Sequence, residues 1–142
     1  MTHVRRIANR ISELRPLAVW TVGIARELGC SAEKCFDVDL CVTEAVSNVI
    51  RHGYLDDREH EIGVEIARVS GMLVLRIEDD AEPFDPLSVT ASQPTSLDEA
   101  GSTGRGIVLL RGGADAASYE RRDGRNRLTL KFAIVPTERP RT

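Results

Sequence analysis

The chain has 142 residues, of which 42% are hydrophobic and 29% charged, so it is long enough for one domain with a real core and too short for two of ordinary size. Its formal net charge of -3 at pH 7 offers no positive excess for neutralising phosphates, which argues against direct nucleic-acid binding. No apolar stretch is long enough to span a membrane and no signal peptide is recognisable, so we expect a cytoplasmic protein without membrane contact. The three cysteines lack the spacing of metal sites or disulfide frameworks and are expected to be small core residues.

Two helices are predicted in the first part of the chain, after a short strand near residues 3–7. Apolar residues recur at helical spacing over residues 12–27. Ser31 is a suitable N-cap for a second helix that runs to His52, and Gly53 is its natural terminator. One face of this second helix is an apolar stripe that is expected to pack into the core, formed by Val38, Val42, Ala45, Val46 and Val49.

A polar face lies beside the apolar stripe of the second helix. Glu44, Asn48 and His52 are spaced four residues apart, so their side chains fall within about 80° of one another around the helix axis. Taken alone, such a trio is more typical of a solvated helix edge than of a ligand site. Two later motifs favour the ligand site.

The second half of the chain is predicted to be strand-rich. Residues 61–69 alternate in polarity, Ser70-Gly71 provides a turn, and residues 72–77 continue as the second strand of a hairpin. Residues 85–103 have the composition of a long loop, which we expect to act as a lid. After the loop we expect, in chain order, a short helix over residues 106–111, strands over residues 116–121 and 126–135 joined by Asp123-Gly124, and a disordered tail over residues 136–142.

This order of elements predicts the α+β class. Strands joined by hairpins, with the helices collected separately, favour a two-layer sandwich in which helices cover one face of a mixed, mostly antiparallel sheet. We expect a single domain over residues 1–142, with a core from about residue 3 to about residue 135.

Two further motifs carry polar or flexible groups. The first follows the hairpin, where Glu78-Asp79-Asp80-Ala81-Glu82 leads into the turn Pro83-Phe84-Asp85-Pro86 and would hold a carboxylate at the mouth of a cleft. The second is Gly101-Ser102-Thr103-Gly104-Arg105-Gly106, which precedes the short helix, so that its backbone N–H groups are suited to phosphates. Alone, each motif is a weak signal.

In this order and spacing the three motifs resemble the N, G1 and G2 boxes of the GHKL ATPase superfamily, and the resemblance covers roughly residues 12–135. Within it the chain looks most like the anti-sigma-factor serine/threonine kinases. The segments that carry this closer similarity are Val42 to Asn48 with His52-Gly53-Tyr54, the Pro83 to Pro86 turn, Gly104 to Ile107, and Asn126-Arg127-Leu128. The resemblance implies a Bergerat-type α/β sandwich, ATP and Mg²⁺ as cofactors, and phosphorylation of a serine on an anti-sigma-factor antagonist.

The resemblance also implies roles for individual residues. Glu44 would be the general base, Asn48 a Mg²⁺ ligand within the ATP site, and Asp79 the acceptor for the adenine amino group. The remaining residues implied for ATP binding are His52, Ala81, Gly101, Gly104, Arg105 and Gly106. Two alternatives stay open: Arg105 contacts the γ-phosphate or faces solvent, and His52 borders the phosphates or caps its helix.

One position departs from the family pattern. The family usually has glycine where this chain has Ala81, so a methyl group is added close to the expected adenine position. The methyl group either weakens nucleotide binding or is accommodated by backbone angles that suit alanine.

Several functional readings compete at this stage. The favoured one is an ATP- and Mg-dependent protein serine kinase that acts as an anti-sigma factor, with the antagonist and a sigma factor as partners. The main alternative is a binding module that sequesters a regulatory partner without catalysis or with weak nucleotide binding. A histidine-kinase catalytic domain and a gyrase-like motor are less favoured, because no phosphoacceptor helix or second domain is evident. Whether the chain forms a homodimer is left open.

Overall fold

The computed structural model describes residues 1–87 and 113–134. Strand β1 (Thr2–Ala8) leads through a 3-10 turn, η1 (Ile11–Glu13), into helix α1 (Leu14–Glu27). The later elements follow in the predicted order: α2 (Ala32–His52), β2 (Glu61–Val69), β3 (Met72–Asp79), β4 (Ala116–Arg122) and β5 (Arg125–Ala133).

Both ends of α2 are fixed by the residues that the sequence indicates. The side-chain oxygen of Ser31 accepts a hydrogen bond from the Lys34 backbone N–H at 3.1 Å, which is an N-cap. At the other end the Gly53 N–H donates to the Val49 carbonyl at 2.9 Å. Gly53 keeps a helical φ of -84°, and glycine is needed here for space, since a Cβ would lie 2.7 Å from that carbonyl oxygen.

The sheet has the strand order β1-β2-β3-β5-β4, and each neighbouring pair of strands is antiparallel. Its two hairpin turns use residues with positive φ, as two-residue turns of this kind require. These residues are Ser70 (50°), Gly71 (80°), Asp123 (54°) and Gly124 (76°). The sheet that we expected to be mixed is thus antiparallel at all of its described pairings.

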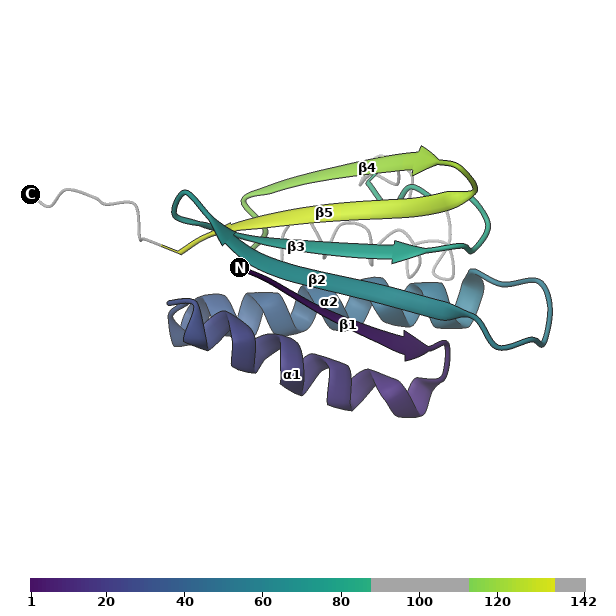
Figure 1. Cartoon of the computed structure of the whole chain (residues 1–142), viewed down its shortest axis with the longest axis horizontal. Coiled ribbons are helices and arrows are strands. Elements are labelled where there is room, and N and C mark those ends of the chain that lie inside the picture. Colours follow the sequence, from purple (N-terminus) through teal and green to yellow (C-terminus); the bar gives the residue numbers. More distant parts are fainter. Residues whose placement is uncertain (88–112, 135–142) are drawn as a thin grey trace, which may run out of the picture.

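The molecule has two layers, with α1 and α2 on one face of the sheet (Figure 1). The core lies between the layers, where alternate residues of β2, β3 and β5 meet the apolar stripes of the helices. The strand residues buried there are Ile62, Val64, Ile66, Leu73, Leu75, Ile77, Leu128, Leu130 and Phe132. The predicted α+β sandwich is confirmed.

The helical stripes also occur as expected. The stripe of α2 is buried at Val38, Val42, Ala45 and Val46. All three cysteines are buried and none forms a disulfide, which confirms their prediction as core residues. Within the described residues, no helix is long and apolar enough to cross a membrane.

The opposite face of the sheet is solvated and carries charges of both signs across neighbouring strands. Arg76 of β3 lies 3.4 Å from Glu65 of β2, and Arg127 of β5 lies 3.0 Å from Glu78 of β3. Partly exposed pairs of this kind contribute little to stability. They fit a sheet with one face in water.

Several predicted features lie outside the described residues. These are the short helix at residues 106–111, the greater part of the expected lid and the tail at residues 136–142. The division of the chain into one domain stays a prediction.

Candidate functional site

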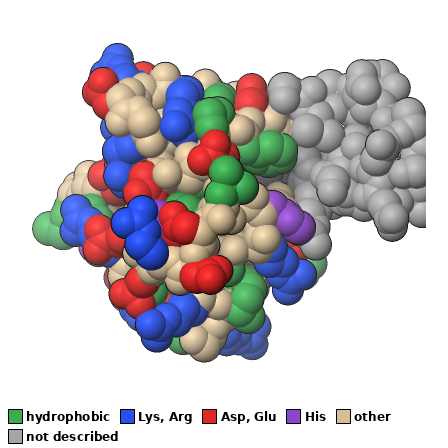
Figure 2. Space-filling model, turned by 90° about the vertical axis from the view of Figure 1, so that its right-hand side faces the viewer, with side chains coloured by type: hydrophobic (Ala, Val, Ile, Leu, Met, Phe, Trp, Pro, Cys, Tyr) green, Lys and Arg blue, Asp and Glu red, His purple; other side chains and the backbone are tan. Residues whose placement is uncertain are grey.

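A cavity of about 260 Å³ opens between the C-terminal half of α2 and the end of β3. Four of the residues predicted for the ATP site line it, namely Asn48, His52, Asp79 and Ala81. The other lining residues are Ala45, Val49, Gly53, Ile77, Glu82, Pro83, Phe84, Pro86, Asn126 and Leu128. Figure 2 views the end of the molecule at which β3 ends, and shows acidic and basic side chains interspersed around it. The lining residues of the cavity itself are mainly apolar with a few polar groups, as is usual for a small-molecule site.

Asp79 is the buried polar centre of the cavity. It is the last residue of β3, is only 3% exposed, and accepts two hydrogen bonds on Oδ1. One comes from the Ala81 backbone N–H at 2.9 Å and the other from the Asn126 side-chain amide at 2.8 Å. With Oδ1 occupied in this way, Oδ2 is the atom to which a ligand amino group would donate.

Burial raises the pKa of Asp79 above its usual range, and the hydrogen bonds from Asn126 and Ala81 oppose this shift. A carboxylate held in so dry a place costs folding free energy at neutral pH. Buried charges with this cost are frequent at binding sites. Its burial at the cavity makes Asp79 a candidate ligand-binding group.

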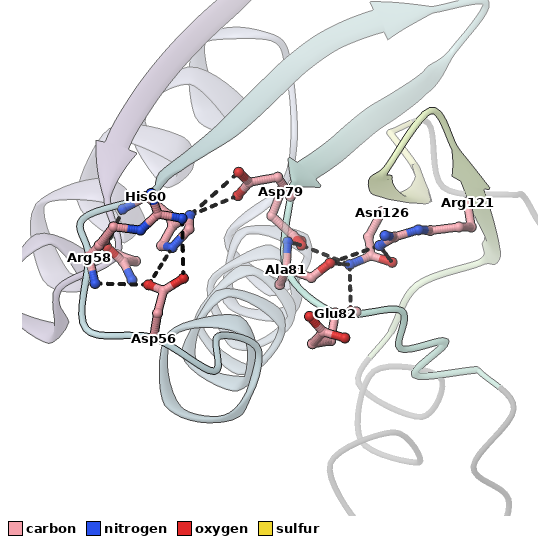
Figure 3. Close-up of polar contacts among 10 residues, drawn as sticks. Asp56, Arg58, His60, Asp79, Ala81, Glu82, Arg121 and Asn126 are labelled. Carbon is pink, nitrogen blue, oxygen red and sulfur yellow. Dashed lines mark hydrogen bonds and ion pairs between the residues drawn. The ribbon is translucent and has the colours of Figure 1, made fainter.

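Asn126 is a site residue to which the sequence assigned no role. It is 6% exposed, and its amide nitrogen also donates to the carbonyls of Ala81 at 3.3 Å and Glu82 at 3.0 Å. Its side-chain oxygen accepts from the Tyr119 hydroxyl and from Arg121. Figure 3 shows Asn126 and Arg121 directed toward the chain at Ala81.

The register of the sheet explains the position of Asn126. Asp79 and Asn126 face each other as partners across β3 and β5. The Asp123-Gly124 turn sets where β5 begins and its register with β4, but not its register with β3. The sequence pattern did not indicate which strand pairs with β3 on this side.

The methyl group of Ala81 is accommodated next to a glycine. A Cβ placed on Gly53 would lie 2.8 Å from the Ala81 Cβ, so the methyl group occupies space that Gly53 leaves open. Ala81 is 5% exposed and does not have a positive φ. A hydrogen bond of 2.9 Å from the Glu82 N–H to the Gly53 carbonyl holds the two segments together. The backbone thus accommodates the methyl group, and the effect of the methyl group on nucleotide binding stays a prediction.

Ala81→Gly is therefore expected to change nucleotide affinity by less than about twofold. It should lower the free energy of unfolding by about 1–2 kcal/mol, because a buried methyl group is lost and the unfolded chain gains freedom. Calorimetry and chemical denaturation measure the two quantities. A tenfold tightening of nucleotide binding would mean that the methyl group does obstruct the purine.

Glu44 lies one helical turn before Asn48 on α2, which places it about 6 Å closer to the N-terminus of the helix. Its side chain is half-buried, and it is not among the described residues that line the cavity. His52 is exposed at the last turn of α2 and borders the cavity. The predicted phosphate-loop residues, namely Gly101, Gly104, Arg105 and Gly106, lie outside the described residues.

The fold is that of the histidine kinase-like ATPase class. A family model described as a histidine kinase-like ATPase domain matches residues 7–132. The serine/threonine-protein kinase BtrW of Bordetella bronchiseptica is 33% identical over 118 residues, which are 82% of this chain and 83% of BtrW. The chain therefore belongs to the histidine kinase-like ATPase family and, within it, to the serine/threonine kinase group that its motifs resemble.

Two further proteins resemble this chain, one in sequence over part of its length and one in fold. The serine-protein kinase RsbW of Listeria monocytogenes is 33% identical over 63 residues, covering 44% of this chain and 40% of that protein. A crystal structure of the RsbU and RsbW domains of Rv1364c from Mycobacterium tuberculosis has a TM-score of 0.65 at 17% identity. It covers 94% of this chain, which spans 32% of that longer chain, and at this identity it shows the fold alone. The predicted enzyme class, a protein kinase with an ATPase-type domain, is confirmed.

Proposed function

We propose that this chain transfers the γ-phosphate of Mg-ATP to a serine of an anti-sigma-factor antagonist, and that it acts as an anti-sigma factor when the antagonist is not available. The observation that carries the proposal is the convergence of Asn48 and buried Asp79 on one cavity, in a family whose named members are serine kinases. The sigma factor as a second partner is part of the same proposal.

In this proposal the purine lies at the Asp79 end of the cavity and the phosphates extend along α2. Asp79 accepts from the adenine amino group, whereas guanine would present a carbonyl oxygen to the same carboxylate. Asn48 offers Mg²⁺ a neutral oxygen, and phosphate oxygens and waters complete its coordination. Glu44, one turn further along α2, takes the proton of the attacking serine hydroxyl. Positioning and charge neutralisation do most of the work in such a transfer.

Asp79→Asn tests the purine end. The amide offers a donor where adenine needs an acceptor, so affinity for Mg-ATP should fall by roughly 10- to 100-fold, the scale of a hydrogen bond to a charged group. Because the new donor suits the guanine carbonyl, the preference for ATP over GTP should also shrink. Calorimetry with both nucleotides measures these changes.

A stability measurement separates lost recognition from unfolding. Burial raises the pKa of Asp79, so ionisation destabilises the wild-type fold progressively as the pH rises through the raised pKa. The variant has no carboxyl group at position 79 and so is not destabilised in this way. Its free energy of unfolding relative to wild type should therefore increase over the same pH interval. Equal affinity of wild type and variant for ATP would exclude Asp79 as the adenine acceptor.

A further inference from the structure

A second polar cluster lies in the connection between α2 and β2. His60 precedes β2, and its side chain is 13% exposed. Its Nε2 lies 2.8 Å from an Asp56 carboxylate oxygen, and its Nδ1 lies 3.4 Å from the carboxylate of Asp80, the residue after Asp79. Figure 3 shows His60 beside Asp56 and Arg58.

The geometry favours the charged form of His60. A neutral imidazole has one N–H and one lone pair, whereas here both ring nitrogens face carboxylate oxygens. Only the imidazolium donates to both, so loss of the proton would set a lone pair against a carboxylate. The hydrogen bond to Asp56 and then that to Asp80 raise the pKa of His60, although desolvation opposes the shift.

His60 joins three parts of the chain. Its backbone is tied to the residue after β1, because its N–H donates to the Asn9 side chain at 2.8 Å and its carbonyl accepts from the Asn9 N–H at 3.0 Å. Its ring stacks on Tyr54 with a centroid separation of 4.1 Å and an angle of 15°. Its second ring nitrogen reaches Asp80 at the exit of β3.

These contacts reach the purine end of the cavity through two adjacent residues. Tyr54 directly follows Gly53, which lines the cavity and holds Glu82 by its carbonyl. Asp80 lies between Asp79 and Ala81, both of which line the cavity. The cluster therefore buttresses the segment that fixes the Asp79 carboxylate.

Among the described residues, the other charged groups near His60 are of both signs. Arg58 pairs with the second oxygen of Asp56 at 3.6 Å. Burial is the largest cause of a raised pKa at Tyr54. The charges of Asp79 and Asp80 raise this pKa further, and Arg125 of β5 opposes the shift. On either side of His60 in the sequence, Glu59 pairs with Arg10 and Glu61 pairs with Arg6. Asp56 and Asp80 are the carboxylates that the ring nitrogens contact, so these two groups sense the charge of the ring.

We propose that the imidazolium of His60 is a positioning residue for the purine end of the nucleotide site, so that affinity for adenine nucleotide falls as His60 loses its proton. This inference rests on the proposed function, because it concerns binding in that cavity. His60 acts through Asp80 and Tyr54 and does not touch the nucleotide itself.

The test compares the Kd for Mg-ATP of wild type and His60→Gln by calorimetry over a range of pH. The ratio of variant to wild-type Kd should be about 10 at pH values below the pKa of His60 and should approach unity above that pKa, where wild-type His60 is neutral as well. Titration of the phosphates cancels in this ratio, since both proteins receive the same ligand. The midpoint should coincide with the pKa of His60 followed by the NMR signal of its ring.

Two further variants sharpen the test. Asp80→Asn leaves His60 in place and should both lower its pKa and flatten the pH dependence of the affinity. His3→Gln is the matched control, because His3 lies on β1 opposite Ile66, away from the end of β2 at which Glu61 pairs with Ala8. It should leave the pH profile of wild type unchanged.

The outcomes separate the inference from the function on which it rests. A Kd ratio that is constant with pH, or a midpoint unrelated to the His60 pKa, would overturn the inference while nucleotide binding stands. The same pH profile change in His3→Gln would also overturn it. If wild type binds no Mg-ATP at any pH, the proposed function fails and the inference fails with it.

Discussion

Glu44→Gln is expected to retain nucleotide affinity and to lose phosphate transfer by at least about 100-fold, the usual scale of general-base catalysis. Glutamine has the shape of glutamate and is compatible with a helix, so the α2 backbone should not change. It cannot accept the serine proton at neutral pH. Nucleotide affinity should be retained because Glu44 does not line the cavity at which the purine is expected.

The measurement is transfer of label from γ-labelled ATP to a purified antagonist protein, beside calorimetry on the same preparation. Glu33→Gln is the matched control, because it makes the same chemical change at an exposed position in the first turn of the same helix. The control should transfer as wild type does. If Glu44→Gln transfers phosphate as fast as wild type, Glu44 is not the base.

Asn48→Ala should remove the dependence of nucleotide binding on Mg²⁺. Loss of an outer-shell partner alone typically lowers metal affinity about 10- to 100-fold, and loss of a direct ligand should cost at least as much. The variant should therefore bind ATP equally weakly with Mg²⁺ and with a chelator present. Calorimetry under both conditions measures this.

Ser47→Ala serves as the control for Asn48→Ala. Ser47 is the preceding residue of α2 and does not line the cavity, so this variant should keep the Mg²⁺ effect. A full Mg²⁺ effect in Asn48→Ala would remove Asn48 from the proposed metal site.

Much of the fold was predictable because its local signals agree. Ser31 caps α2 as expected, and the Asp123-Gly124 and Ser70-Gly71 turns carry the positive φ values of two-residue hairpins. The boundaries of strands differ by a few residues, and β3 extends to Asp79. That extension matters, because it places the carboxylate at the end of a strand and in register with β5.

The site was predictable where it depends on one helix or one strand end. Helical spacing groups Asn48 with His52, and the end of the hairpin supplies Asp79. Asn126 and the space that Gly53 leaves for Ala81 depend on pairings between distant segments, which no local pattern encodes. The His60 cluster was missed for the same reason, since its partners come from a loop and from the exit of another strand.

The most direct test of the proposed function is transfer of the γ-phosphate of Mg-ATP to an antagonist protein with a serine acceptor. We expect label to enter the antagonist in the presence of wild-type chain, to be absent when the acceptor serine is replaced by alanine, and to fall by at least about 100-fold with Glu44→Gln. Tight binding of the antagonist and of Mg-ATP without any transfer by wild type would contradict the kinase and support the non-catalytic binding module.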